Sequence, residues 1–268
     1  MTFHSKFHSV IQATGSLVCV GLDPDPGKMP APYASADSRN IADFLKAIIE
    51  YTAPYCSAYK LNLAFFEVFG ESGWKTVQEI SGFIPNNRIR IADGKRGDIG
   101  NTAKFYAQSM FRELDFDAAT VNPYMGKDSV APFIENPEKG AFILTLTSNP
   151  GASDFQFLGG DKPLFLAVAE KAVEWNVHQN IGLVTGATQA EHFAALRRIA
   201  PGLPFLIPGI GAQGGDLEKV VLQAVKGFAG KGLINSSRGI LYASANADFA
   251  EKAAQAAKKL RDDIKTLL

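Results

Sequence analysis

Short runs rich in Val, Ile, Leu and Phe recur along the whole chain, separated by more polar segments. Each run has the length and composition of a buried β-strand. Eight such runs predict strands within residues 16–23, 55–66, 88–95, 118–126, 140–149, 180–188, 204–211 and 232–239. Between them, apolar residues recur with helical spacing. This spacing predicts helices that include 40–51, 102–114, 163–175, 190–200 and an amphipathic last segment at 254–268.

Regular alternation of strand and helix implies a parallel sheet joined by right-handed crossovers. Eight units in 268 residues match a (β/α)8 barrel, whereas an open doubly wound sheet usually has fewer strands. No linker divides the chain, so we expect a single TIM-barrel domain over residues 1–268. Two Gly- and Pro-rich stretches, 23–37 and 148–163, follow predicted strands. We expect them to be loops on the face where barrels build their sites.

Composition and charge narrow the class of protein. Lys and Arg together number 27, as do Asp and Glu, so no net field attracts nucleic acid or an anionic membrane. Cys19 and Cys56 are too far apart for a CxxC pair and are interpreted as buried thiols in a reducing compartment. No stretch has the apolar core of a signal peptide or the roughly 18 apolar residues of a membrane span. We therefore expect a soluble cytoplasmic protein.

Polar and glycine residues end most of the predicted strands, where a purely structural turn does not require them. In a (β/α)8 barrel these ends meet at one mouth. The residues concerned are Asp23, Lys60, Asn62, Asp93, Lys95, Ser148, Asn149, Pro208, Gly209, Gly211, Gln213, Ser236, Ser237 and Arg238. The sequence therefore predicts one polar site at the carboxyl ends of the strands.

The segment IADGKRGDIGNT, residues 91–102, concentrates charge after an alternating run. Because alternate residues of a strand share a face, Asp93 and Lys95 point where the isoleucines of this run point. If that face is the barrel interior, both charges lie at the mouth of the barrel. Lys60 and Asn62 likewise share a face on the preceding predicted strand. A structural network of ion pairs is the alternative. Buried ion pairs add little net stability, so the cluster favours a functional site.

A glycine-rich segment, GIGAQGG at 209–215, precedes a predicted helix and can cradle an anion with its backbone N–H groups. Its G-x-G-x-x-G pattern is typical of the first turn of a Rossmann unit, but here it follows the seventh strand. Barrels often bind phosphate with the loops after strands seven and eight, which contain Gln213 and Arg238. An arginine fork suits phosphate oxygens. The alternative is that these glycines only shape turns.

Other chemistries find little support. His4 and His8 are four residues apart, but no third ligand accompanies them and no HExxH motif occurs, so we predict no metal site. Neither Ser148 nor Cys56 has a histidine at a neighbouring strand end, which argues against acyl transfer.

Residues 93–99, DGKRGDI, resemble the DxKxxDI signature of the orotidine 5′-phosphate decarboxylase family. The resemblance covers almost the whole chain and is closest to the longer branch, common in mycobacteria and various other bacteria. Its other motifs are VGLDP (20–24), YKLNLAFFE (59–67), TVNPYMG (120–126), TSNPG (147–151), PGIGAQGG (208–215) and NSSRGI (235–240). The resemblance implies cofactor-free decarboxylation of orotidine 5′-phosphate to uridine 5′-monophosphate, the last step of UMP biosynthesis.

The resemblance also implies roles for single residues. The alternating tetrad of the family corresponds to Lys60, Asp93, Lys95 and Asp98, with Lys95 as the proton donor. In the family, the residues that match Asp98 and Thr102 reach into the neighbouring subunit's site, which implies a homodimer.

The remaining matches concern the nucleotide substrate. The resemblance implies that Asp23 holds the ribose hydroxyls, that Ser148 holds the pyrimidine edge, and that Gln213 and Arg238 hold the 5′-phosphate. Ser237 stands where the shorter enzymes have a glycine directly before the phosphate-binding arginine.

Two other functions compete with this interpretation. A magnesium-dependent sugar-phosphate lyase of the same superfamily, such as hexulose-phosphate synthase, shares the DxKxxD core but needs an additional Glu and Asp near the strand ends. The second predicted strand offers Lys60 and Asn62 instead. A non-catalytic barrel that only binds a phosphorylated ligand is expected to lose one charge of the tetrad. All four are present, which favours the decarboxylase.

Overall fold

A closed barrel of parallel strands forms the centre of the molecule. The computed structural model describes residues 1–35, 37–210, 215–228 and 232–268. Within them, eight strands pair in sequence order around the barrel. The strands are β1 (Val18–Gly21), β2 (Ala58–Asn62), β3 (Ile89–Arg96), β4 (Ala118–Val121), β5 (Gly140–Leu146), β6 (Ile181–Thr185), β7 (Phe205–Pro208) and β8 (Gly232–Ser236). Seven of them lie inside one predicted run, and β3 extends one residue beyond the run at 88–95. The predicted (β/α)8 fold is confirmed.

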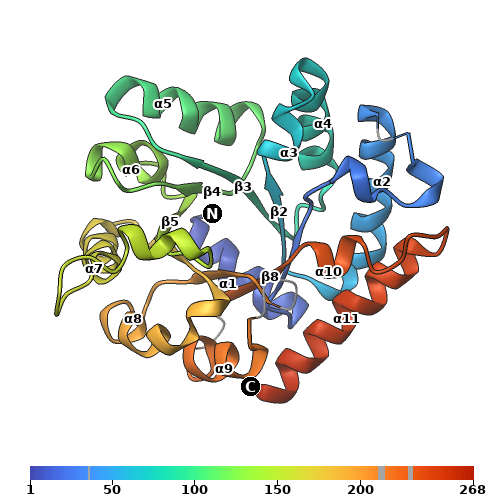
Figure 1. The fold of residues 1–268 in the computed structure, drawn as a ribbon. Helices are drawn as coiled ribbons and strands as arrows, with labels where there is room; N and C mark the ends of the chain where they lie inside the picture. The colour runs from blue at the N-terminus through green and yellow to red at the C-terminus, as the bar shows by residue number, and fades with distance from the viewer. Residues whose placement is uncertain (36, 211–214, 229–231) are drawn as a thin grey trace.

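Most of the helices surround this barrel as a ring (Figure 1). The α-helices of the described residues are α1 (Phe3–Thr14), α2 (Ser38–Thr52), α3 (Ala64–Glu67), α4 (Gly70–Phe83), α5 (Gly100–Gln108), α6 (Lys127–Ile134), α7 (Leu164–Trp175), α8 (Phe193–Ile199), α9 (Leu217–Val220), α10 (Arg238–Leu241) and α11 (Phe249–Leu267). The predicted helix at 102–114 is α5 followed by a π-helical turn at 109–113. In the described part of the chain, we find no helix with the length and apolarity of a membrane span.

Strand residues that point outward form the main core beneath the helices. On β2, for example, Tyr59 and Leu61 belong to the same buried cluster as Phe44 of α2 and Ile80 of α4. Cys56 is a free, buried thiol, as is Cys19, and burial raises the pKa of Cys56 to about 11. The prediction of buried cysteines is therefore confirmed.

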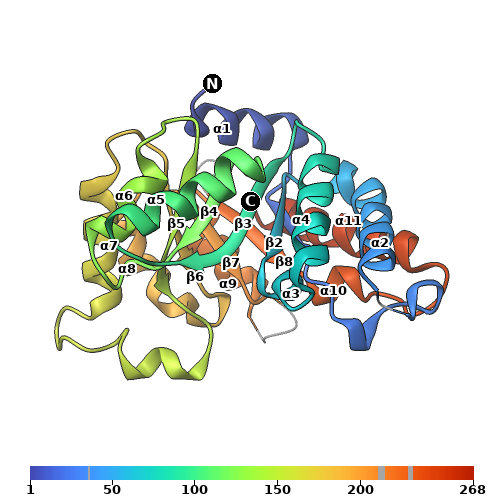
Figure 2. The same ribbon diagram turned by 90° about the horizontal axis from the view of Figure 1, so that it is seen from above.

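Strand residues that point inward form a second buried cluster, which helix α1 closes at the amino ends of the strands. Phe3, Phe7 and Val10 of α1 are buried against inward-facing residues of the strands. Lys6 of α1 makes an ion pair of 2.6 Å with Asp117, directly before β4. Figure 2 shows α1 across one end of the barrel and the short helices α3 and α10 at the other. No helix was predicted for residues 3–14.

Two glycines leave room for the aromatic rings at this closed end. A Cβ atom on Gly140 would lie 2.5 Å from the ring of Phe3, and one on Gly182 would lie 2.5 Å from the ring of Phe142. The rings of Phe3 and Phe142 meet edge to face, with centroids 6.3 Å apart. The amino end of the barrel is therefore filled by packed rings.

Replacement of Phe7 by alanine tests this closure. We expect Phe7→Ala to lower the free energy of unfolding by about 3–5 kcal/mol, because it leaves a cavity under the barrel. Chemical denaturation measures the loss. Phe155→Ala is the control, since the Phe155 side chain is exposed in the loop after β5, and its loss should stay below about 0.5 kcal/mol. Equal losses in both variants would show that α1 does not seal the barrel.

Candidate active site

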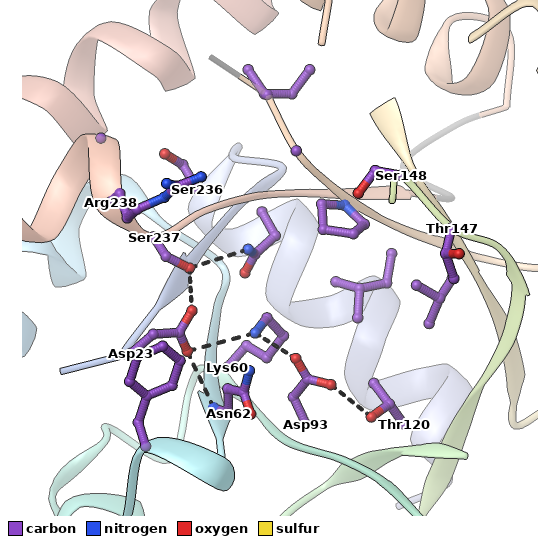
Figure 3. A pocket seen from close by; sticks show the side chains of 18 of the residues that line it. Asp23, Lys60, Asn62, Asp93, Thr120, Thr147, Ser148, Ser236, Ser237 and Arg238 are labelled. Carbon is purple, nitrogen blue, oxygen red and sulfur yellow. Dashed lines mark hydrogen bonds and ion pairs between the residues drawn. The ribbon is translucent and has the colours of Figure 1, made fainter. Parts of the chain in front are cut away.

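A cavity of about 660 Å³ opens at the carboxyl ends of the strands. It lies at the end opposite α1, where barrels build their sites. Its lining includes Asp23, Lys60, Asn62, Asp93, Lys95, Thr120, Leu144, Thr147, Ser148, Val184, Leu206, Pro208, Asn235, Ser237, Arg238 and Tyr242. Figure 3 shows many of these side chains converging from different strands. The predicted gathering of polar strand ends is thus observed.

Asp93 is the centre of the polar contacts. Its Oδ2 atom lies 2.7 Å from Lys60 Nζ, and its Oδ1 atom lies 2.8 Å from Lys95 Nζ. Thr120 Oγ1 donates a further hydrogen bond of 2.8 Å to Oδ1 (Figure 3). Only 8% of the Asp93 side chain is exposed. Asp93 follows the buried Ile91 into the barrel interior, as the strand period predicts.

These contacts keep the buried groups charged. Burial on its own raises the pKa of Asp93, but the ammonium groups of Lys60 and Lys95 outweigh it and hold this pKa well below its usual value. Burial likewise lowers the pKa of Lys60, yet the Asp23 and Asp93 carboxylates raise it above its usual value. Around neutral pH the site therefore contains an ionised Asp93 beside a protonated Lys60.

Asp23 joins β1 to the end of β8. Ser237 Oγ donates to Asp23 Oδ2 over 2.6 Å, and the Asn62 N–H donates to Oδ1 over 3.2 Å. The Tyr242 hydroxyl donates to the Asp23 carbonyl over 3.2 Å, and burial raises the pKa of Tyr242 to about 12. A Cβ atom on Gly21 would lie 1.9 Å from Ser237 Oγ. The approach of Ser237 to Asp23 therefore depends on this glycine.

Ser148 lines the cavity at the start of a folded loop. Gln156 makes two hydrogen bonds to Thr147, the residue before Ser148. Its Oε1 accepts from the Thr147 N–H and its Nε2 donates to Thr147 Oγ1, each over 2.8 Å. Phe157 packs on His192, with ring centroids 5.3 Å apart. The predicted loop at 148–163 is thus attached to the site by Gln156 and to the helical ring by Phe157. The sequence carried no signal that distinguished Gln156 from other polar loop residues.

Arg238 begins α10 and lines the cavity beside Ser237. Gly209 lines the cavity at the end of β7, with a left-handed φ of 104°, and its carbonyl accepts from Gly215 N over 3.1 Å. The predicted helix after this segment is α9. Gln213 lies outside the described residues, as do Gly211 and Gly214, so the role of Gln213 stays a prediction.

Asp98 and Thr102 do not line the cavity of their own chain. Asp98 Oδ1 accepts from the N–H of the next residue over 2.8 Å, and Thr102 is exposed on α5. Arg96, between Lys95 and Asp98, instead pairs with Glu67 and lies over the Tyr106 ring, 5.3 Å from its centroid. After Lys95 the chain thus turns away from the cavity, and Asp98 no longer lines it.

His4 and His8 lie on α1, at the far end of the barrel from the cavity. Among the described residues, no three His, Cys, Asp or Glu side chains are grouped so that they could hold a metal ion.

The fold and the cavity define a (β/α)8-barrel enzyme with a lysine–aspartate–lysine site at the carboxyl ends of its strands. Residues 16–254 match the model of the orotidine 5′-phosphate decarboxylase / HUMPS family. This chain therefore belongs to that family.

Individual relatives agree with this assignment. The chain is 50% identical over 269 residues to orotidine 5′-phosphate decarboxylase of Dehalococcoides mccartyi, covering 98% of this chain and 97% of the relative. The structure of Leishmania donovani OMP decarboxylase matches with a TM-score of 0.89 and 39% identity, over 100% of this chain and 99% of that one. Leishmania donovani UMP synthase matches with a TM-score of 0.90 and 40% identity, over 100% of this chain and 56% of that longer chain.

The charge of Asp93 predicts a pH dependence of stability. Because its pKa is lower in the folded protein than in the unfolded chain, ionised Asp93 stabilises the fold above about pH 4, and this contribution is lost as the pH falls further. From about pH 5 to about pH 3, we expect wild type to lose about 1 kcal/mol more of its free energy of unfolding than Asp93→Asn. Urea unfolding at both pH values measures the difference.

The matched control for this measurement is Asp161→Asn, which alters an exposed carboxylate. It should retain the acid sensitivity of wild type. If Asp93→Asn is as acid-sensitive as wild type, Asp93 is not held ionised by its lysine partners.

Proposed function

We propose that this chain decarboxylates orotidine 5′-phosphate to uridine 5′-monophosphate without a cofactor, and that residues 1–268 act as one catalytic domain. The observation that carries the proposal is the difference between the two lysines on Asp93. The Lys60 side chain is 5% exposed, whereas that of Lys95 is 48% exposed and lines the cavity. Lys95 is thus the cation available to a ligand, and Lys60 is its buried support.

The chemistry requires such a cation. When the bond between C6 of the pyrimidine and the carboxylate breaks, its electron pair stays on C6 as a vinyl carbanion that no conjugated group stabilises. A positioned ammonium group stabilises charge where it develops. Lys95 then donates its proton to C6 to form the C–H bond, and the neutral amine regains a proton from solvent. Lys95 thus supplies both the charge and the proton.

Asp93 contributes by its negative charge. In the proposed complex it lies near the substrate carboxylate, and two unit charges about 4 Å apart repel by about 4 kcal/mol at an effective dielectric constant of about 20. Loss of CO₂ removes this repulsion, which is a form of ground-state destabilisation. The lowered pKa of Asp93 supports this role, because a neutral acid would not repel the substrate. Lys60 and, from the partner subunit, Asp98 complete the alternating tetrad.

The rest of the substrate is assigned to residues outside the charged tetrad. We assign the 5′-phosphate to Gln213 and Arg238, the ribose hydroxyls to Asp23, and the pyrimidine edge to Ser148. Ser237 donates to Asp23, which supports a role for Ser237 in orienting that carboxylate. A volume of about 660 Å³ suits a nucleotide. Binding energy from the remote phosphate can then support catalysis at C6.

The sugar-phosphate lyase is the alternative within the same family. The three carboxylates in the cavity lining all lie next to lysines: Asp23 and Asp93 next to Lys60, and Asp25 next to Lys28. The Dehalococcoides mccartyi relative is named a decarboxylase. These observations favour the decarboxylase over the lyase, and likewise over a barrel that only binds a phosphorylated ligand.

The proposed enzyme is a homodimer in which Asp98 and Thr102 serve the partner's site. Both residues lie outside the cavity of their own chain. Ile99 and Phe105 are exposed apolar residues of the same segment, after β3, and Tyr124 and Met125 are exposed apolar residues after β4. Exposed apolar groups of this kind are typical of subunit interfaces.

We place the protein in the cytoplasm, with a small nucleotide as its ligand and without nucleic acid or membrane partners. The free thiols of Cys19 and Cys56 suit a reducing compartment. The balance of 27 basic and 27 acidic residues gives no general attraction to polyanions.

Replacement of Lys95 tests the proposed reaction. In an assay of orotidine 5′-phosphate absorbance run in EDTA, we expect wild type to be active. Lys95→Ala should lose at least about a thousandfold in kcat, since both the cation and the proton donor are removed. Lys171→Ala, which removes an exposed lysine of α7, should retain wild-type kcat. Near-normal kcat in Lys95→Ala would refute the mechanism.

A mixing experiment tests the shared site. Lys95→Ala and Asp98→Ala should each be inactive, but a randomised mixture should recover about a quarter of wild-type activity, because half the dimers are mixed and each carries one intact site. Activity after unfolding and refolding the two variants together is the measurement. If Asp98 acts within its own chain, no intact site forms and no activity returns.

A further inference from the structure

Lys95 has a backbone conformation that is rare for a residue with a side chain. Its φ is 47°, in the left-handed region. Such a conformation costs about 1–3 kcal/mol and persists only where the surroundings enforce it. The pairing of β3 with β4 also shifts register here, from Ala92 opposite Ala119 to Arg96 opposite Val121. The regular ladder therefore does not hold the backbone of Lys95.

The side-chain hydroxyl of Thr120, instead of a backbone carbonyl, accepts the hydrogen bond of the Lys95 N–H. The backbone N–H of Lys95 donates to Thr120 Oγ1 over 2.9 Å, and Thr120 Oγ1 donates to Asp93 Oδ1 over 2.8 Å. The same Oδ1 atom accepts from Lys95 Nζ over 2.8 Å. The direction of these bonds is fixed, because an amide N–H only donates and an ionised carboxylate only accepts.

The three bonds form a closed ring that begins and ends at Lys95. The ring runs from its backbone through Thr120 and Asp93 to its ammonium group. Thr120 itself is 1% exposed and is fixed in β4, opposite Phe142 of β5. The ring therefore ties both ends of a partly exposed lysine to the rigid barrel.

We propose that Thr120 is a positioning residue for Lys95 and Asp93, an inference that rests on the proposed decarboxylation. Thr120 fixes the backbone of the proton donor and one oxygen of its anionic neighbour at the same time. Loss of the hydroxyl frees the Lys95 backbone and removes a donor from Asp93, so the ammonium group is no longer held at one point. The groups assigned to phosphate and base are not part of the ring.

The test compares two substitutions of Thr120 in decarboxylation assays. Thr120→Val keeps the shape and removes the hydroxyl, and its kcat should fall about 10- to 100-fold with KM within about threefold of wild type. Thr120→Ser keeps the hydroxyl and should restore kcat to within about threefold of wild type. Thr120→Ala serves as a second variant without the hydroxyl if Thr120→Val does not fold.

Thr145→Val is the matched control, because Thr145 is also a buried strand threonine, on β5, and its hydroxyl donates to the Ile143 carbonyl. It should retain wild-type kcat. A merely structural role for Thr120 would instead lower the stability of Thr120→Val and leave its kcat per folded molecule unchanged. Unchanged kcat in folded Thr120→Val overturns the inference.

A crystal structure of Thr120→Val separates this inference from the proposed function. We expect Lys95 to leave the left-handed region or its ammonium to move from Asp93 Oδ1. If wild type does not decarboxylate orotidine 5′-phosphate, the proposed function fails, while this structure still decides whether Thr120 positions Lys95. Unchanged positions of Lys95 and Asp93 would overturn the positioning role in either case.

Discussion

The ionised carboxylate of Asp93 inside the barrel is the constraint on which the site depends. A buried charge is unfavourable by several kcal/mol unless it is paired and hydrogen-bonded. Lys60 engages one oxygen, while Lys95 and Thr120 share the other. The barrel makes this possible because β2 and β4 are the two neighbours of β3, so Lys60 and Thr120 both reach Asp93. The fold thus supplies, from three strands, partners that no single segment could provide.

The two ends of the barrel have opposite characters, and the apolar end supports the polar one. At the amino end, Phe3 and Phe7 of α1 pack on Phe142, and Gly140 and Gly182 leave room for the rings. This packing excludes water beneath the charged layer. A drier surrounding strengthens the attraction between opposite charges. The stability of the apolar end is therefore part of the electrostatics of the polar end.

Much of this arrangement could be predicted because it is encoded locally. Each strand is a short apolar run, and the two-residue period places Asp93 on the same face as Ile91. The structure shows that this face is the barrel interior. Helix α1 was missed although Phe3, Phe7 and Val10 have helical spacing, because it lies before the first predicted strand and outside the alternation of strands and helices. Thr120 was missed as a functional residue because its bonds depend on a register shift between β3 and β4. The hydrogen bonds from Gln156 to Thr147 depend on how the loop at 148–163 folds, which the sequence of the loop does not specify.

The position of Met1 at the closed end of the barrel determines where a tag or a second domain joined to it would lie. The amino group of Met1 pairs with Glu138 over 2.9 Å, shortly before the start of β5, and so lies on the α1 side (Figure 2). A tag, a solid support or a second domain joined through Met1 therefore extends away from the mouth that admits the ligand. Linkage at Met1 therefore leaves access to Lys95 unobstructed.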